Sequence, residues 1–508
     1  MNKNSHPEIG GRSAKIALVL LVIVYVFNFI DRQILSVLAE DIKADLNITD
    51  SDLGFLFGTA FAVFYAIFGL PLGRLADVWS RKKLISIGLV TWSLMTALSG
   101  TAKSFFSLSV YRVGVGIGES SASPASYSLL SDYFPPKVRT TILAIYSSGV
   151  YIGAGIGVFL GGWIVELWNN AYPDPSLAPL GLRGWQAAFM GVGIPGLILA
   201  CFTWQIKEPK RGMSDGIETP EHPHPFKEML NEFVGITPLA LLGSKQYKKL
   251  LGINFLIALM IAIASYFLII LTGDMVQWIA FGFGCYVVTC WIQGLQIRDY
   301  ATYSMIFKSK ALLFSVIGFP FLSFITYSGA AFGPAFYMRN FGVSEGEVAT
   351  VLGLTAAIAG MTGVILGGII GDKLRKKYVN GRFYVAFLVI LLIAPFNLGV
   401  LYSENLYASY IWNFIVQLIS PMWVGIAPAI VADLVMPRMR AIAGAFYILM
   451  VSMLGLALGP YSVGLLSDTL ISQGYSDAEG LKTALAASMG VLVISATTLL
   501  LACRYLPG

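Results

Sequence analysis

The chain has 508 residues, of which 56% are hydrophobic and 12% charged, with a mean hydropathy of +0.73 and a formal net charge of +6. Soluble globular proteins carry about 25% charged residues, so this composition excludes a soluble enzyme or binding module and indicates a polytopic membrane protein. The small positive balance does not predict nucleic-acid binding, and the four cysteines lie in apolar stretches without metal-ligand spacing.

Fourteen apolar stretches approach the length of about 20 residues that a membrane-spanning helix requires. In chain order, the predicted spans are residues 15–38, 52–74, 84–101, 104–131, 140–166, 185–206, 249–272, 276–296, 311–338, 347–371, 383–402, 405–432, 441–466 and 483–503. The sixth span is followed by a polar segment, residues 207–233, that is rich in Pro, Gly and charge. We interpret this segment as a cytoplasmic linker.

The distribution of basic residues orients these spans. With the N-terminus inside, 27 of the 34 Lys and Arg residues fall in inside segments and 5 in outside segments, while Arg32 and Arg112 lie within spans. Cytoplasmic loops of membrane proteins carry such an excess of basic residues. We therefore expect a multi-pass protein of a cell inner membrane with both termini in the cytoplasm.

Four strongly ionisable residues lie deep within the predicted spans, namely Asp31, Arg32, Arg112 and Glu119. Each charge at such a depth costs about 2.5–3.5 kcal/mol, so charges there tend to be paired and to face a cavity. Arg112 and Glu119 are seven residues apart and share one helix face, whereas the adjacent Asp31 and Arg32 point about 100° apart. The spacing favours Arg32 facing Glu119 and Asp31 facing Arg112 or a cavity, but it does not fix this arrangement.

These charges have two interpretations. They form either a static network that orients two helices or a proton-binding site that is coupled to substrate. All three histidines lie in predicted cytoplasmic segments, so proton-driven transport requires a carboxylate within the membrane. Burial and a nearby arginine act in opposite directions on the protonation of a carboxylate. If protons drive transport, the candidate carriers are therefore the two carboxylates within the spans, Asp31 and Glu119.

Polar and aromatic residues within the spans are candidate substrate contacts. Asn28 precedes the two charged residues of the first span by three and four positions and shares their side of the helix. The candidates are Asn28, Arg32, Arg112, Tyr146, Tyr327 and Asn413. The alternative for the aromatic residues is a role in packing. Glycines at near-four spacing within residues 149–162 predict a close approach between helices.

Two pairs of segments recur at nearly the same offset, which indicates an internal repeat. GRLADVWSRKK (73–83) matches GIIGDKLRKK (368–377), and DYFPPKVR (132–139) matches DLVMPRMR (433–440), at offsets of 295 and 301 residues. Each copy follows the second or the fourth span of its half.

The repeat divides the chain into related halves of six spans each. We predict an all-α membrane protein with an N-terminal six-helix bundle at 1–206 and a C-terminal six-helix bundle at 311–508. A cytoplasmic linker at 207–248 and an inserted two-helix hairpin with its connector at 249–310 separate the bundles. An even number of inserted spans leaves the orientation of the second bundle unchanged.

The repeated motifs supply candidate gating and structural residues. Lys and Arg suit a helix C-terminus, whereas an acid there is unfavourable unless it is paired. Asp77 and Asp372 are thus candidate latches to a neighbouring Arg or to another helix; the alternative is that they only fix topology. The full set is Gly73, Asp77, Arg81, Asp132, Arg139, Asp372, Asp433 and Arg440.

These motifs also carry a family resemblance. The pattern G-x-L-A-D-x-x-x-R-K-K at 73–83 and the element Arg112-V-G-V-Gly116 resemble signature motifs of the major facilitator superfamily. Within it, NFIDRQILSVLAED (28–41) and GVGIGESSASPAS (114–126) resemble the Spinster-like transporters.

The resemblance implies a major facilitator fold whose two bundles alternate in access around a central site. It implies coupling roles for Asp31 and Glu119, with Arg32 as a site for a substrate anion or as their partner. The inserted spans depart from the twelve-span pattern of most Spinster-like proteins. Ser80 and Val158 also stand where the superfamily usually has Gly and Pro, and both weaken any inference about exchange.

The sequence contains no P-loop lysine motif, no HExxH and no Ser/His/Asp set that reaches a common face, so we expect neither an enzyme nor a cofactor or metal site. We predict a monomeric secondary transporter, surrounded by membrane lipid, that moves a small-molecule amphiphile or organic anion together with protons. A uniporter and a drug-type exporter are the alternatives. A polytopic acyl- or glycosyltransferase and a non-transporting sensor are further ones, but the reactive polar cluster and the large soluble domain that they require are not visible.

Overall fold

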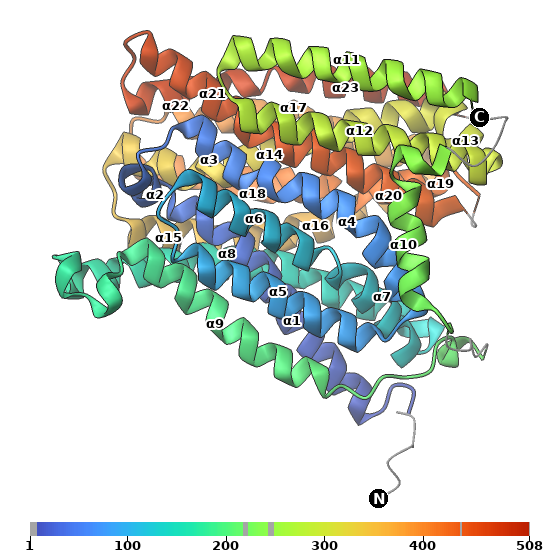
Figure 1. Cartoon of the computed structure of the whole chain (residues 1–508). Helices are drawn as coiled ribbons and strands as arrows, with labels where there is room; N and C mark the ends of the chain where they lie inside the picture. Colours follow the sequence, from blue (N-terminus) through green and yellow to red (C-terminus); the bar gives the residue numbers. More distant parts are fainter. Residues whose placement is uncertain (1–7, 217–221, 242–247, 437–438, 507–508) are drawn as a thin grey trace, which may run out of the picture. The chain divides into compact units, whose positions relative to one another are not determined.

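The computed structural model describes residues 8–216, 222–241, 248–436 and 439–506, and the regular structure of these residues is helical (Figure 1). Contacts divide the chain into a first unit, Met1–Leu38 with Phe64–Val234, and a second unit, Ala39–Val63 with Gly235–Gly508. Both chain ends lie outside the described residues, and so do parts of the predicted linker. The prediction of cytoplasmic termini concerns these ends.

The first unit contains the helices that carry the four intramembrane charges. Its helices are α1 (Arg12–Val37), the larger part of α4 (Thr59–Val78), α5 (Arg81–Ser99), α6 (Phe105–Glu119), α7 (Ala122–Tyr133), α8 (Pro136–Ala171), η1 (Pro175–Leu177), η2 (Pro179–Gly181), α9 (Gly184–Trp204), η3 (Met213–Asp215) and α10 (Pro225–Gly235). The predicted span 104–131 is divided into α6 and α7. Ser120 and Ser121 lie at this break, and their hydroxyls donate to carbonyl groups three residues earlier, a local bond that competes with the helical pattern.

Glycines of α8 allow α1 to pack against it at backbone distance. A Cβ atom at Gly153 would lie 2.4 Å from the carbonyl oxygen of Val26, and one at Gly157 would lie 2.8 Å from the Cα atom of Ile30. Only a residue without a side chain fits such an approach. The predicted close approach is therefore confirmed, and it fixes α1, with its charged residues, beside α8.

The second unit holds the remaining helices. They are α2 (Ala39–Leu46), α3 (Asp50–Phe57), the start of α4, η4 (Pro238–Leu241), α11 (Lys248–Thr272), α12 (Met275–Arg298), α13 (Tyr300–Lys308), α14 (Lys310–Phe341), α15 (Glu345–Thr355), η6 (Ala356–Gly360), α16 (Met361–Lys377), α17 (Gly381–Tyr402), α18 (Leu406–Ile419), η7 (Ser420–Trp423), α19 (Ile426–Asp433), α20 (Arg440–Met450), η9 (Val451–Ala457), α21 (Leu458–Ser472), α22 (Asp477–Ser488) and α23 (Val491–Arg504). The segments η6 and η9 are π-helical insertions within two of the predicted spans.

The predicted hairpin of α11 and α12 is present in the second unit, where the two helices lie side by side (Figure 1). Asn254 of α11 donates to Gln293 of α12 over 2.7 Å, and the hydroxyl of Tyr286 donates to Asn254 over 2.9 Å. The other face of α11 is apolar and open, with Phe255 71% and Leu271 80% exposed. This face suits contact with lipid.

Helix α12 joins the hairpin to the rest of the second unit. The hydroxyl of Tyr461 in α21 donates to Asp274 over 2.7 Å, and the ring of Trp291 stacks on Phe446 of α20 with centroids 5.9 Å apart. The inserted pair is thus packed against the helices that form the eleventh core span of the predicted fold.

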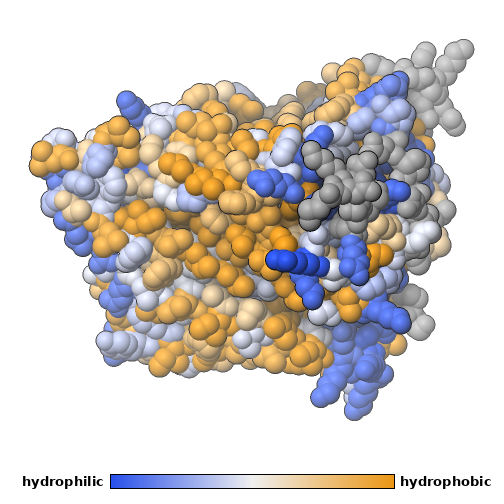
Figure 2. Space-filling view, turned by 90° about the horizontal axis from the view of Figure 1, so that it is seen from below, coloured by the Kyte–Doolittle hydropathy of each residue, from blue (hydrophilic) through white to orange (hydrophobic). Residues whose placement is uncertain are grey.

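Twelve helices of the described residues, some of them merged across short breaks, are long and apolar enough to cross a membrane. The two other predicted spans coincide with α5 and with the divided pair α6 and α7. Helix α5 starts with Arg81, Lys82 and Lys83, which shortens its apolar part. Figure 2 shows many large apolar side chains on the visible surface, as expected for a bilayer protein. The count of fourteen stays a prediction.

Candidate functional site

One face of α1 presents a polar and aromatic surface within the first unit. Tyr25, Asn28, Phe29 and Arg32 follow the helical spacing i, i+3, i+4, i+7. The Nε atom of Arg32 donates to the Oε2 atom of Glu119 over 2.6 Å, and the side chains are 15% and 0% exposed, respectively. The expected contact between these two residues is therefore confirmed.

Aromatic rings flank the guanidinium of Arg32. Its Cζ atom lies 4.8 Å from the ring centre of Phe29 and 4.8 Å from that of Tyr65 in α4. Cations are attracted to the faces of aromatic rings. Arg32 is thus held between a carboxylate and two rings, and it is the more exposed member of its ion pair.

Asp31 has a different environment from that of Glu119. Its side chain is 0% exposed, and neither carboxylate oxygen has a hydrogen-bond partner among the described residues. Thr96 of α5 lies next to it. The Nη1 atom of the buried Arg112 donates over 3.1 Å to the backbone carbonyl oxygen of Asp31. Arg112 thus faces Asp31, which is one of the two arrangements that the sequence left open. The hydrogen bond is made to the main chain of Asp31 and not to its carboxylate.

Tyr146 lies in an aromatic cluster of the first unit. Its ring stacks on Tyr25 with centroids 4.4 Å apart and meets the edge of Tyr127 at 5.2 Å. The side chain is 0% exposed, and its hydroxyl has no hydrogen-bond partner in the described part of the chain. The site therefore combines two carboxylates and two arginines with a wall of tyrosines.

The two candidates from the predicted C-terminal bundle, Tyr327 and Asn413, belong to the second unit. Tyr327 of α14 lies close to Tyr447 of α20. Asn413 of α18 is 9% exposed, and its amide nitrogen has no hydrogen-bond partner among the residues that the structure describes.

At the basic end of α5, Arg81 organises a network of ion pairs. It is fully buried, pairs with Asp132 of α7, and donates through Nε to Glu208 over 3.0 Å and through Nη2 to the carbonyl of Pro209 over 2.9 Å. Burial alone would raise the pKa of Glu208. Hydrogen bonds from the hydroxyl of Ser80 and from the N–H groups of Arg81 outweigh burial and hold the pKa of Glu208 below its ordinary value.

The other members of the first basic hairpin are less constrained. Asp77 is exposed and forms no hydrogen bond or ion pair among the described residues, although Arg211 and Arg74 lie near it. A Cβ atom at Gly73 would meet only the ring of Pro124, at 4.0 Å. The ion pair that the sequence suggests for Asp77 is therefore not formed within the described residues of the first unit.

The second basic hairpin repeats one pairing of the first, because an arginine at the start of the following helix again binds the acid of the Asp-Pro-Arg loop. Arg382 contacts Asp372 over 2.9 Å and Asp433 over 2.6 Å. Asp433 is the residue that aligns with Asp132, the partner of Arg81. Each unit thus joins its hairpin to the acid of its Asp-Pro-Arg loop.

A further hydrogen bond supports the repeat. Arg139 donates to the carbonyl of Ser131 over 3.0 Å, and Arg440 donates to the carbonyl of Ala432 over 3.2 Å. In both cases the acceptor lies eight residues before the arginine. The arginine that ends each repeated motif therefore makes the same kind of contact in both units.

The second unit contains a charged network that the sequence did not suggest. Arg339 of α14 donates to Glu40 over 2.7 Å and to Asp50 over 2.7 Å, and Lys43 donates to Asp50 over 2.9 Å. Asp468 of α21 accepts the backbone N–H group of Asp50 over 3.0 Å. The network joins the segment 39–63 to α14 and α21.

Comparison with known proteins identifies the family. The model of the Major Facilitator Superfamily matches residues 21–460. The chain belongs to this superfamily. It is therefore a multi-pass membrane transporter of small molecules and not an enzyme.

Several relatives are Spinster proteins. Human protein spinster homolog 1 is 26% identical over 482 residues, which cover 91% of this chain and 74% of the relative. An MFS-type efflux pump of Mycolicibacterium smegmatis is 25% identical over 461 residues, which cover 91% of this chain and 86% of the pump.

Solved structures agree on the fold. A bacterial homologue of the human lysosomal transporter Spinster superimposes with a TM-score of 0.75 at 24% identity, covering 97% of this chain and 98% of that one. A bacterial homologue of human drug peptide transporters gives a TM-score of 0.61 at 13% identity, covering 97% of each chain. The major facilitator fold and the Spinster-like character predicted from the sequence are thus supported.

Sequence reasoning missed several residues of this site. Tyr25 was accessible from the sequence, because it continues the spacing of Asn28 and Arg32 along one face of α1. Thr96 and Tyr65 gave no such signal, since a single threonine or tyrosine in an apolar span has no distinguishing pattern.

Proposed function

We propose that this superfamily member is a proton-coupled transporter of an amphiphilic organic anion. It acts as a monomer by alternating access, in a cell inner membrane with both termini in the cytoplasm. Residues 1–206 and 311–508 are the moving bundles, and residues 249–310 are an added hairpin. The ion pairs of the two basic hairpins stabilise one conformation of the transporter, and they break when it changes to the other.

The unequal environments of the two buried carboxylates support the coupling. Glu119 is balanced by Arg32 at 2.6 Å, whereas the carboxylate oxygens of Asp31 accept no hydrogen bond from the described residues. An ionised carboxylate that is buried without hydrogen bonds is costly, while the neutral acid is much less so. A movement of α1 that changes these contacts would bind or release a proton.

The position of Arg32 supports an anionic substrate. An anion that pairs with Arg32 would compete with Glu119 for the same guanidinium. A proton on Glu119 would then restore the charge balance that the ion pair provided. The neighbouring rings of Phe29 and Tyr65 suit an apolar portion of the same molecule. Binding of the anion and of a proton would therefore favour each other.

Two alternatives keep specific support. The similarity to an efflux pump favours a drug-type exporter, and a static role for the charges favours a uniporter. A uniporter predicts that an imposed pH gradient does not accelerate uptake by the natural chain, and a drug-type exporter predicts transport of drug-like amphiphiles that carry no anionic group.

The test is uptake of radiolabelled lysophosphatidylglycerol into proteoliposomes with and without an imposed pH gradient. We expect the gradient to accelerate uptake by the natural chain. Asp31→Asn and Glu119→Gln should abolish this acceleration while exchange without a gradient persists. Asp174→Asn, in the exposed loop after α8, is the matched control and should behave as the natural chain. Full acceleration in both site variants would refute the coupling.

Thermal stabilisation of the purified protein by a panel of amphiphilic anions and neutral analogues tests the substrate class separately. Arg32→Gln should remove stabilisation by anions and leave any stabilisation by neutral analogues. Equal stabilisation by charged and neutral compounds would contradict an anionic substrate.

A further inference from the structure

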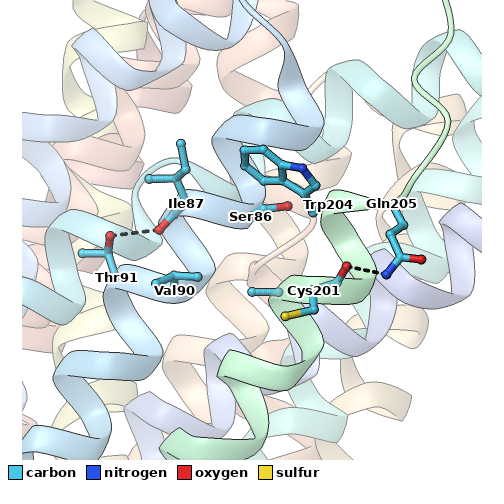
Figure 3. Close-up of a pocket in the computed structure, with 8 residues that line it drawn as sticks. Ser86, Ile87, Val90, Thr91, Cys201, Trp204 and Gln205 are labelled. Atoms are coloured by element: carbon cyan, nitrogen blue, oxygen red, sulfur yellow. Dashed lines mark hydrogen bonds between the residues drawn. The ribbon is translucent and has the colours of Figure 1, made fainter.

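A groove of about 410 Å³ runs along the outer surface of the first unit between α5 and α9 (Figure 3). Its walls include Ile87, Val90 and Trp204, which are 47%, 43% and 48% exposed, respectively. Large exposed apolar side chains on both helices are expected where a surface faces lipid.

Three of the polar side chains that line the groove already have partners. The hydroxyl of Thr91 donates to the carbonyl of Ile87 over 2.9 Å, and the amide of Gln205 donates to the carbonyl of Cys201 over 3.1 Å (Figure 3). The hydroxyl of Ser86 donates to the carbonyl of Lys82 over 2.8 Å. The groove therefore suits a hydrocarbon chain and not a polar ligand.

A second cavity, of about 510 Å³, lies at the basic end of the same two helices. Four basic side chains and one carboxylate line it, together with His222. Arg81 and Arg211 are engaged, the first with acids and the second with the carbonyls of Ala76 and Trp79. Lys83 and Lys210 also line the cavity, and both side chains are exposed there, although Lys210 has a contact within the protein as well.

The groove and the basic cavity follow one another along the chain. On α5, Lys83 of the cavity lies three residues before Ser86 of the groove, so about 4.5 Å of helix rise separates the two linings. After α9, Glu208 of the cavity lies three residues beyond Gln205 of the groove. The eight residues from Lys83 to Thr91 rise about 12 Å. One leaflet of a bilayer has a hydrocarbon depth of about 15 Å.

We propose that the groove and the basic cavity together bind one anionic phospholipid of the cytoplasmic leaflet. An acyl chain lies along α5 and α9, and the phosphate group of the head contacts Lys83 and Lys210. The inference rests on the proposed orientation, in which the start of α5 is cytoplasmic, and does not depend on proton coupling or on the transported substrate.

Charge must provide the selectivity of this site. Within a bilayer, the surrounding lipid is as apolar as the groove, so a tail gains little by moving into it. Anionic head groups are attracted to basic residues near the cytoplasmic surface, and each such residue contributes about fivefold in affinity. Two lysines therefore distinguish an anionic from a zwitterionic lipid with the same tails.

The test uses the purified full-length chain in vesicles that contain phosphatidylglycerol or phosphatidylcholine with a photoreactive group in one acyl chain. Peptides from residues 86–91 and 200–205 are then analysed for adducts by mass spectrometry. We expect at least about fivefold more adducts from phosphatidylglycerol than from phosphatidylcholine. The double variant Lys83→Glu, Lys210→Glu should reduce labelling by phosphatidylglycerol to the level of phosphatidylcholine.

Two further variants separate the head from the tail. Val90→Trp, which fills the groove from its exposed side, should lower adducts in these peptides with both lipids. Lys373→Glu with Lys376→Glu reverses two exposed charges at the other basic hairpin and should leave labelling unchanged. Equal labelling by the two lipids, or labelling that survives the reversal at Lys83 and Lys210, would overturn the proposal. No pH gradient or substrate is used, so failure of the transport hypothesis would leave this result unaffected.

Discussion

Replacing Arg339 by glutamine removes the centre of the charged network in the second unit. Arg339 is 6% exposed in its side chain and makes four hydrogen bonds, of 2.7–3.0 Å, to Glu40 and Asp50. The variant leaves Asp50, whose side chain is 0% exposed. Lys43 at 2.9 Å and the hydroxyl of Ser467 at 2.7 Å remain as its partners.

The structure sets the expected magnitude. Removal of one partner from a buried ion pair costs about 3–5 kcal/mol, because the other charge stays buried and uncompensated. Lys43 retains part of the compensation, so we expect a loss of about 2–3 kcal/mol in the free energy of unfolding. Glu40 is 29% exposed, and its removal leaves Arg339 paired with Asp50, so Glu40→Gln should cost less, about 1 kcal/mol.

The assay is unfolding of the purified protein in mixed micelles with increasing dodecyl sulfate. The double variant Asp50→Asn, Arg339→Gln should lose less than the sum of the two single variants, because removal of both charges leaves neither one unpaired. A loss below about 1 kcal/mol for Arg339→Gln, or strict additivity in the double variant, would refute the view that this network stabilises the second unit.

Two further predictions concern the first unit. Gly157→Val should destabilise the protein by about 1–3 kcal/mol, because its Cβ atom would lie 2.8 Å from the Cα atom of Ile30. Gly149→Ala should cost less, since the nearest atom to its Cβ would lie at 3.3 Å. Equal unfolding midpoints for the two variants would contradict this. Because the pKa of Glu208 is lower in the folded protein, its ion pair with Arg81 stabilises the fold fully at pH values above its ordinary pKa of 4.5. This stabilisation is lost as the pH falls through the lower pKa of the folded state. Thermal midpoints should therefore fall below about pH 4.5, and Glu208→Gln should flatten that dependence; an unchanged slope in the variant would exclude this group.

Much of the fold was predictable because the bilayer imposes a simple rule on the sequence. The predicted span 249–272 corresponds to α11, and 383–402 corresponds to α17, within two residues at each end. The repeat was visible because Asp132 and Asp433 are each followed by a proline four residues later and an arginine seven residues later. The π-helical segments and the break between α6 and α7 were not predictable, since they depend on packing and not on hydropathy.

The candidate site was only partly predictable for a different reason. Arg32 and Glu119 were identifiable because charges are rare in apolar spans. Glu208 and Arg339 lie in or near polar segments, where charged residues are common, so nothing in the sequence distinguished them. Their partners come from distant parts of the chain, and hydropathy carries no information about such pairs.

The bond from Arg112 to the main chain of α1 has a mechanical consequence. A peptide oxygen does not take up a proton in the physiological range, so this attachment between α1 and α6 is insensitive to pH. The attachment from Arg32 to Glu119 ends in a group that does titrate. Protonation of Glu119 would then weaken its contact with Arg32 and leave the bond from Arg112 to the main chain intact, so α1 would stay attached to α6 near Asp31.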